Sequence, residues 1–148
     1  MADVAVIWGS TSDTNVMQQA VDILQEFGIS CETRVLSAHR QPRATAEFAS
    51  NAASRGIKVI IAGAGLAAAL PGVVAAHTTV PVIGVPIAGG PLNGVDSLYA
   101  IVQMPSGIPV ATVGISNAKN AALLAVEILS LSDTALAGKL SEFRERMT

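Results

Sequence analysis

The sequence predicts an α/β domain in which a five-stranded parallel sheet is covered by helices on both faces. Short runs rich in Val and Ile alternate along the chain with longer segments of helical pattern, as in repeated β-α units. Apolar residues make up 51% of the chain and aromatic residues only 3%, so the core consists mainly of Ala, Val, Ile and Leu, which suits helices packed tightly on a sheet. A length of 148 residues fits one domain, residues 1–148.

The predicted strands are short and apolar, as expected for parallel strands buried on both faces. In chain order they are Val4–Trp8, Thr33–Leu36, Lys58–Ala62, Val82–Val85 and Val110–Val113. Helix-like segments alternate with them and mostly end just before Gly or Pro. They are Asn15–Phe27, Pro42–Arg55, Ala67–His77, Val95–Gln103 and Asn117–Leu131. Because such β-α connections are right-handed, the ligand crevice is expected at the carboxyl ends of the strands.

Charge and composition argue against several classes of partner. The chain has 9 basic and 11 acidic residues and no basic cluster beyond Arg144–Arg146, which argues against binding nucleic acid. The single cysteine, Cys31, cannot form an internal disulfide and is expected to be a small buried hydrophobe in a reducing compartment. The apolar run Val4–Trp8 follows the N-terminus without a charged leader, and Gly and Pro interrupt the long apolar stretches. We therefore expect a cytoplasmic protein that does not bind membranes.

Acid–base chemistry is indicated by Ser37-Ala38-His39-Arg40, which follows the second predicted strand. Histidine titrates near neutral pH, and arginine presents a rigid fork of donors suited to phosphate or carboxylate. His39 is therefore a candidate general acid or base beside an anion anchor, Arg40. The other histidine, His77, lies near a predicted helix end, where a cationic side chain is favourable, and we expect a structural role or a subunit contact.

The first predicted strand runs into Gly9-Ser10-Thr11-Ser12-Asp13, a loop of small polar residues. Its backbone N–H groups and hydroxyls can point at an anion near the start of the next helix, and Ser10 and Asp13 are the strongest candidates. The alternative is an ordinary helix cap in which Ser12 or Asp13 accepts from free amides.

Two further loops follow the third and fourth strands. The third strand ends in Gly63-Ala64-Gly65, whose glycines let the backbone approach a ligand, whereas Ala67–Ala69 favours close helix packing. The segment Pro86–Gly94 is rich in turn residues and is expected to cover a bound substrate.

Several motifs together resemble one family. In chain order they are GSTSD, SAHR, GAG followed by LPG, PVIGVP, LNGVDSL, IVQMPSGIPVAT and NAALLA. Over roughly residues 4–131 they resemble the PurE family, the N5-carboxyaminoimidazole ribonucleotide mutases of de novo purine synthesis. The resemblance implies a flavodoxin-like three-layer α/β/α sandwich, a homo-octamer with active sites at subunit junctions, and a C-terminal helical tail at about residues 132–148 that packs on a neighbouring subunit.

The resemblance also implies roles for individual residues. Ser10 and Asp13 would bind the ribose-phosphate region, Arg40 the phosphate, and His39 would be the catalytic acid and base. The remaining substrate-binding set would be Gly9, Ser12, Ser37, Gly65 and Leu70.

In the implied reaction the N5-carboxylate leaves as CO2, C4 of the aminoimidazole attacks that CO2, and His39 carries the proton. No metal or organic cofactor is implied, because the electron-rich aminoimidazole supplies the nucleophilic carbon. Two alternatives stay open: an aminoimidazole ribonucleotide carboxylase that uses CO2 directly, and a non-catalytic flavodoxin-like nucleotide-binding module. Arg40 favours the mutase, since the carboxylases typically have lysine there.

One position departs from the family pattern, which has a histidine where this chain has Ala69. Loss of that imidazole would either lower turnover or mark a subgroup with a different carboxyl source. His77 lies about two helical turns further on, or ~12 Å, and is therefore no simple replacement.

Overall fold

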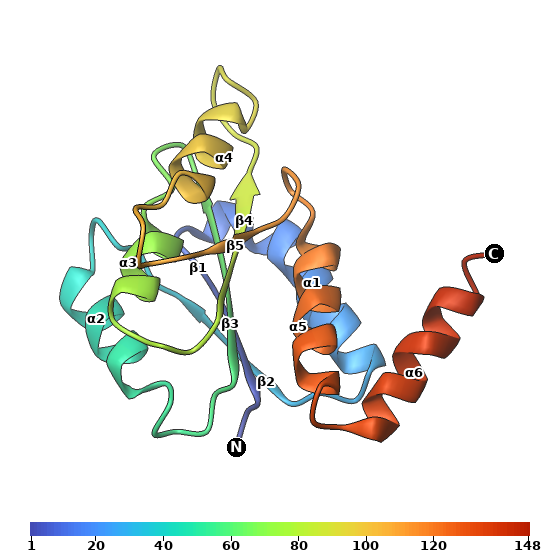
Figure 1. Ribbon diagram of the computed structural model, residues 1–148. Helices are drawn as coiled ribbons and strands as arrows, with labels where there is room; N and C mark the ends of the chain where they lie inside the picture. The colour runs from blue at the N-terminus through green and yellow to red at the C-terminus, as the bar shows by residue number, and fades with distance from the viewer.

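The structure, a computed structural model that describes residues 1–148, confirms the predicted three-layer α/β fold. Five parallel strands form one sheet in the order β2-β1-β3-β4-β5 (Figure 1). The strands are β1 Val4–Trp8, β2 Cys31–Val35, β3 Val59–Gly65, β4 Val82–Ile87 and β5 Ala111–Thr112. A short 3₁₀ helix, η1 Thr11–Asp13, precedes the helices α1 Thr14–Glu26, α2 Pro42–Asn51, α3 Leu70–Ala76, α4 Val95–Val102, α5 Ala118–Ser130 and α6 Thr134–Glu145.

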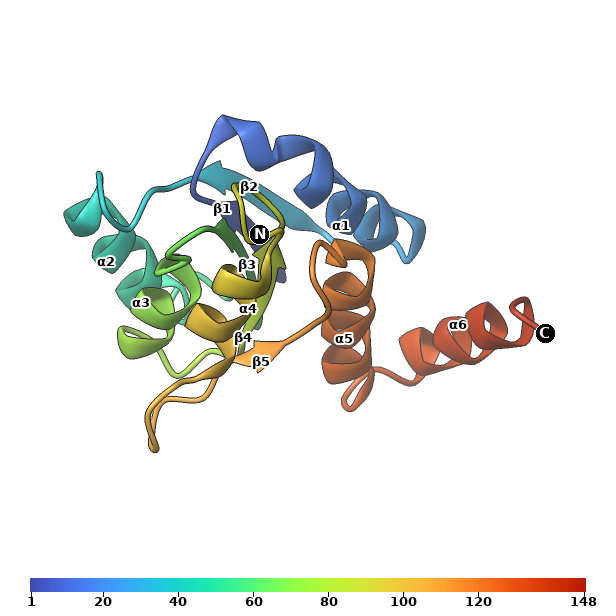
Figure 2. The same cartoon turned by 90° about the horizontal axis from the view of Figure 1, so that it is seen from above.

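The sheet separates two hydrophobic clusters. Side chains of β1 alternate between them, so that Val4, Val6 and Trp8 face α1 and α5, while Ala5 and Ile7 face α2, α3 and α4. Seen from above, α1 and α5 lie on one side of the sheet and α2, α3 and α4 on the other (Figure 2). All five residues of β1 are buried, which explains why its sequence is continuously apolar.

Several predicted boundaries are wrong by a few residues. The third helix begins at Leu70 rather than Ala67, because Leu66 and Ala68 have φ angles of 54° and 43° and a left-handed residue cannot continue a right-handed helix. Leu66 and Ala67 therefore form a turn, and Ala68 and Ala69 precede the helix. The expected helix packing by this alanine run is wrong, although Ala68 is buried in the core beside Leu70.

Other corrections concern the ends of neighbouring elements. The second helix ends at Asn51 and is followed by turns up to the left-handed Gly56, whose φ is 85°. The second strand begins at Cys31, two residues earlier than predicted, and Leu36 lies beyond its end. The fifth strand is reduced to two residues, since only Ala111 and Thr112 pair with β4.

The C-terminal segment forms α6, which extends away from the sheet (Figure 1). Asp133 caps it by accepting from the Leu136 N–H at 3.0 Å. Leu136 is buried, and the Phe143 ring lies 5.6 Å from the Phe27 ring, so one side of α6 packs on its own chain. None of the helices has the length and apolarity needed to cross a bilayer.

Candidate active site

The loop after β1 presents hydroxyls and amides at the carboxyl edge of the sheet. Ser10 has extended backbone angles, and its Oγ accepts from the Ser12 N–H at 3.3 Å and lies 2.9 Å from Ser12 Oγ. The Asp13 N–H donates to the Ser10 carbonyl at 3.0 Å, which closes the 3₁₀ turn that leads into α1. Ser12 is exposed and Ser10 half-buried, so both hydroxyls remain accessible to a ligand.

Asp13 does not cap the helix that it precedes. Its side chain makes no capping hydrogen bond, and Ser10 rather than Ser12 or Asp13 accepts from a free amide. The alternative interpretation of this loop as a cap by Ser12 or Asp13 is therefore wrong. Partial burial of the carboxyl group raises the pKa of Asp13 above its ordinary value, because desolvation disfavours the charged form.

Gly9 and Trp8 connect this loop to the sheet. A Cβ built on Gly9 would lie 3.8 Å from the Leu36 carbonyl, an ordinary contact, so packing alone does not require glycine here. Trp8 is almost fully buried and its Nε1 donates to Thr14 Oγ1 at 3.1 Å. The indole therefore fixes the first residue of α1 relative to the end of β1.

The loop after β2 is hydrogen-bonded to the end of β1 and exposes two polar side chains. The Leu36 N–H donates to the Trp8 carbonyl at 2.8 Å, which places the loop beside the end of β1. Ser37 Oγ accepts from the Arg40 N–H at 3.2 Å, and the Ser37 carbonyl accepts from the Gln41 N–H at 2.7 Å. Ser37 thus shapes the turn that presents His39 and Arg40, both of which are exposed.

The loop after β3 contains Gly65 and leads to Leu70. A Cβ built on Gly65 would lie 3.3 Å from the Ile87 carbonyl, so glycine permits close approach to β4. The Leu70 side chain is only 2% exposed and packs in the core, so a ligand would reach its backbone N–H in the first turn of α3 rather than its side chain. Ala69 is half-buried before this turn, and exposed His77 follows the far end of the same helix.

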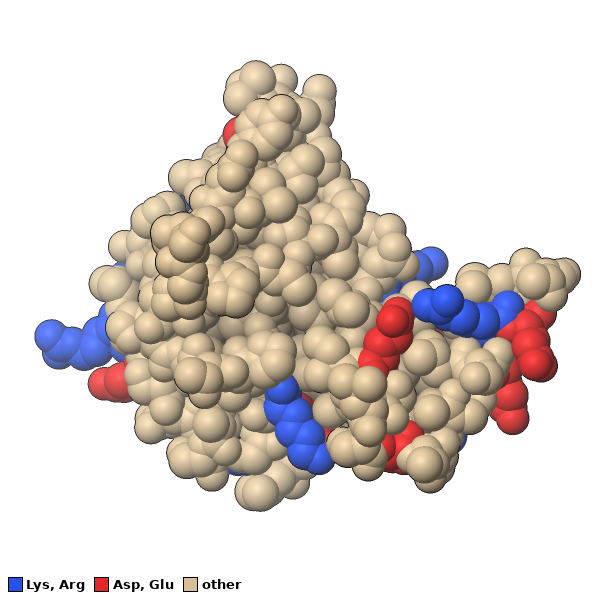
Figure 3. Space-filling view, viewed as in Figure 1, with Lys and Arg blue, Asp and Glu red and all other residues tan.

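The sheet order brings these loops to one edge. Trp8 lies opposite both Val35 and Gly63, so the loop after β1 is flanked by the His39 loop and the Gly65 loop. In the space-filling view the upper part of the molecule shows few charged side chains, whereas charges gather on the lower part and around α6 (Figure 3). The structure therefore places the proposed acid–base residue, the cation and the hydroxyls on one rim.

Some polar groups at this edge were not identified from the sequence. Ser97 Oγ is buried within 3.0 Å of the Ile87 carbonyl, and Ser116 Oγ accepts from the Ala88 N–H at 3.0 Å. Their contacts join segments distant along the chain, which local patterns do not reveal. The chain brings together no group of three or more His, Cys, Asp or Glu side chains that could hold a metal.

The sequence model of the AIR carboxylase family matches residues 3–148. This chain belongs to that family. It is 57% identical over 147 residues to the N5-carboxyaminoimidazole ribonucleotide mutase of Thermotoga maritima, covering 99% of this chain and 86% of that protein. The corresponding protein of Saccharolobus solfataricus is 58% identical over 147 residues, covering 99% of this chain and 93% of that protein.

A solved structure of the family has the same fold as this chain. The crystal structure of Treponema denticola PurE superposes with a TM-score of 0.88 at 32% identity, covering 97% of this chain and 89% of that chain. The predicted resemblance to PurE and the predicted flavodoxin-like fold are both confirmed.

Proposed function

We propose that this chain is an N5-carboxyaminoimidazole ribonucleotide (N5-CAIR) mutase, an isomerase of purine biosynthesis. The observation that carries the proposal is the identity of 57% and 58% to two mutases over 99% of the chain. The exposed pair His39 and Arg40 at the carboxyl edge supplies the chemistry that such an enzyme needs. The substrate is a small ribonucleotide, and the product is its C4-carboxylated isomer, CAIR.

The proposed mechanism moves one proton and one carboxyl group. Protonated His39 gives its proton to the exocyclic nitrogen as the N–C bond breaks, which yields CO2 and aminoimidazole ribonucleotide (AIR). The C4 carbon of AIR then attacks CO2, and neutral His39 removes the proton from C4. The charges and atoms balance without a cofactor, because the aminoimidazole provides the electron pair for the new C–C bond.

Binding is assigned to the groups around His39. Arg40 pairs with the phosphate, as a guanidinium matches phosphate geometry. Ser10, Ser12 and Asp13 bind the ribose-phosphate region through hydroxyl, amide and carboxyl groups. Gly9, Ser37, Gly65 and the Leu70 backbone are proposed to line the remainder of the site, because they lie in the loops that follow β1, β2 and β3.

The reaction depends on one imidazole, because α3 separates His77 from this edge and Ala69 carries no titratable group. A rate that depends on His39 alone distinguishes this enzyme from a non-catalytic nucleotide-binding module.

The test is ATP-free formation of CAIR from N5-CAIR, compared with AIR plus bicarbonate. If the enzyme converts N5-CAIR but not AIR plus bicarbonate, the result supports the mutase. Efficient use of AIR plus bicarbonate supports the carboxylase. If neither substrate gives CAIR, the proposal that the chain is a catalyst is refuted.

We also propose that the chain assembles with copies of itself, as a homo-octamer. Support comes from α4 and the loop before it, which expose Leu92 at 58%, Tyr99 at 62% and Val102 at 47%. Light scattering tests this: the mass of eight chains is expected, and a monomer at micromolar concentration contradicts it.

The C-terminal tail is proposed to contact a neighbouring copy through the side of α6 that its own chain does not cover. Leu131, just before α6, is 88% exposed, which supports a contact there. Leu131→Asp should lower the assembled mass in the same light-scattering experiment while the fold persists.

The cytoplasm is the proposed location. Support comes from the free, half-buried thiol of Cys31, which is compatible with a reducing compartment. Fractionation of cells followed by immunodetection tests this, and recovery outside the cytoplasm would contradict it.

A further inference from the structure

The segment Ala88–Gly94, here called the cover loop, follows β4 at the carboxyl edge. It projects beyond the ends of the strands in Figure 1, and in the view from above it lies over the central part of the sheet (Figure 2). Gly65 pairs with Ile87, so the cover loop starts beside the loop that follows β3. A Cβ built on Gly90 would lie 2.8 Å from Leu66 Cδ2, which shows how closely the two loops approach.

The two ends of the cover loop are tied together from inside. Ser97 is fully buried, and its Oγ lies 3.0 Å from the Ile87 carbonyl and 2.9 Å from the Gly94 carbonyl. One hydroxyl therefore bridges the last residue of β4 and the residue that precedes α4. This contact closes the base of the loop and leaves its direction to be set by other contacts.

A second tie comes from the loop between β5 and α5. The Ser116 N–H donates to the Pro86 carbonyl at 2.7 Å, and Ser116 Oγ accepts from the Ala88 N–H at 3.0 Å. These two bonds hold the start of the cover loop on both sides of Ile87. Ser116 makes them with a φ angle of 56°, a left-handed conformation that is unfavourable for a non-glycine residue.

The same loop also packs against the far end of the cover loop. A Cβ built on Gly94 would lie 2.5 Å from Ile115 Cγ2 and 3.1 Å from Ala88 Cα. Gly94 is left-handed, with a φ of 92°, and its lack of a side chain lets Ile115 approach. Residues Ile115 and Ser116 therefore contact both ends of the cover loop.

We propose that Ser116 is a positioning residue for substrate binding: its hydroxyl holds the cover loop, through the Ala88 N–H, in the orientation that encloses the ribonucleotide. The inference rests on the proposed function for the identity of the ligand. Glycine would adopt this left-handed conformation without the steric strain that a serine has there, so backbone conformation alone favours glycine at this position. The hydrogen bond to Ala88 gives the serine a use that glycine lacks.

Two variants separate the hydroxyl from the backbone conformation. Ser116→Gly removes the hydroxyl and relieves the left-handed strain, whereas Ser116→Ala removes the hydroxyl and keeps the strain. We expect Ser116→Gly to melt at the temperature of the parent or above it, and Ser116→Ala to melt lower. Both variants should raise KM for N5-CAIR by about 3- to 10-fold, the loss expected for one hydrogen bond, with a smaller change in kcat.

Hydrogen–deuterium exchange measures how well the backbone amides of the cover loop are protected, and it does not require the enzyme to turn over. The amides of the cover loop, Ala88 in particular, should exchange faster in both variants than in the parent. The matched control is Ser54→Ala, which removes a hydroxyl that donates to the Asn51 carbonyl at 3.0 Å in a turn at the opposite edge. This control should keep the parent's KM and its exchange in the cover loop.

The outcomes are distinguishable. Parental KM and parental exchange in Ser116→Gly would overturn the proposal, as would a KM that follows melting temperature across the variants. A parent enzyme that makes no CAIR would refute the proposed function and the substrate part of this inference, while the exchange rates would still decide whether Ser116 holds the loop.

Discussion

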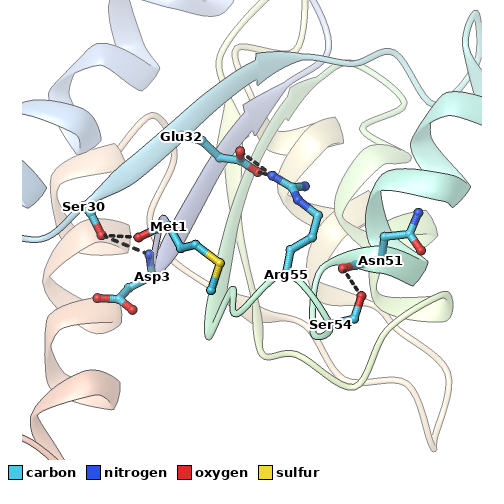
Figure 4. Close-up of polar contacts among 7 residues, drawn as sticks. All are labelled: Met1, Asp3, Ser30, Glu32, Asn51, Ser54 and Arg55. Atoms are coloured by element: carbon cyan, nitrogen blue, oxygen red, sulfur yellow. Dashed lines mark hydrogen bonds and ion pairs between the residues drawn. The ribbon is translucent and has the colours of Figure 1, made fainter.

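At the amino edge of the sheet charged side chains form ion pairs, Arg55 with Glu32 and Lys58 with Asp3, whereas at the carboxyl edge Arg40 pairs with no acidic side chain. Figure 4 shows the amino edge, where the Arg55 guanidinium contacts both carboxylate oxygens of Glu32. Nearby, Ser30 Oγ donates to the Met1 carbonyl and accepts from the Asp3 N–H, both at 3.2 Å. At the carboxyl edge His39 and Arg40 are exposed and no side-chain ion pair includes Arg40.

The two edges also differ in which residues have a left-handed backbone conformation. In the segments that lead into the strands at the amino edge, the residues with positive φ are all glycines: Gly28 before β2, Gly56 before β3 and Gly107 before β5. The left-handed residues other than glycine all lie in loops at the carboxyl edge: Leu66, Ala68, Asn93 and Ser116. Each such residue costs about 1 kcal/mol or more, so this edge retains strain that the amino edge avoids. Free polar groups and retained strain together are typical of a functional site.

The two histidines give the largest contrast between the edges. His39→Asn is expected to lower kcat for N5-CAIR by about 10²- to 10⁴-fold, because the proton carrier is lost. The melting temperature should stay unchanged, since His39 is exposed. His77→Asn is the control, because His77 is also exposed but follows α3 at the amino edge. Similar losses in both variants would contradict the placement of catalysis at the carboxyl edge.

Arg40 tests whether the carboxyl edge binds the phosphate. Arg40→Ala should raise KM by about 10- to 100-fold, the effect of losing charge-assisted hydrogen bonds, while kcat changes less. The matched control is Arg43→Ala, which removes the same charge from an exposed residue in the first turn of α2. Steady-state kinetics on both variants check this. An equal rise in KM for both would mean that the cations act through general electrostatics rather than through a specific contact.

Substitution of Asp13 tests how much a half-buried carboxyl group at the carboxyl edge lowers the stability of the fold. Because burial raises the pKa of Asp13, the unfolded chain releases this proton at a lower pH than the folded protein does. Protonation of Asp13 therefore contributes to the free energy of unfolding. This contribution is fully present below the pKa that Asp13 has in the unfolded chain, and it is lost as the pH rises through the pKa that Asp13 has in the folded protein. Asp13→Asn should therefore melt higher than the parent near neutral pH, and the difference should shrink on acidification.

The measurement for Asp13 is a series of thermal melts between about pH 3 and pH 7, together with KM at neutral pH. If Asp13 binds the substrate, the stabilised variant should have a raised KM. A difference in melting temperature that grows on acidification would contradict the assigned direction of the pKa shift.

Sequence patterns predicted the sheet better than the loops at its carboxyl edge. The strands could be predicted because runs such as Val4–Trp8 are apolar at every position, which only a doubly covered parallel strand requires. The start of α3 could not be predicted, because Leu66 and Ala68 are left-handed without a local signal. His39 and Arg40 were identified from adjacent residues, whereas Ser116 acts on Ala88 through a contact between distant segments.

The smallest effect is expected at the amino edge, where Glu32→Gln removes the charge that pairs with Arg55. The side chains are 27% and 38% exposed, and such partly exposed pairs contribute about 1 kcal/mol or less. Arg55 also keeps its position over the Phe48 ring, at 5.7 Å from the ring centre, which limits the loss further. Urea denaturation should show this small decrease in unfolding free energy, and kcat/KM for N5-CAIR should match that of the parent. A large loss of activity with stability preserved would mean that the ion pair influences the opposite edge, and the assignment of stability to one edge and chemistry to the other would then be wrong.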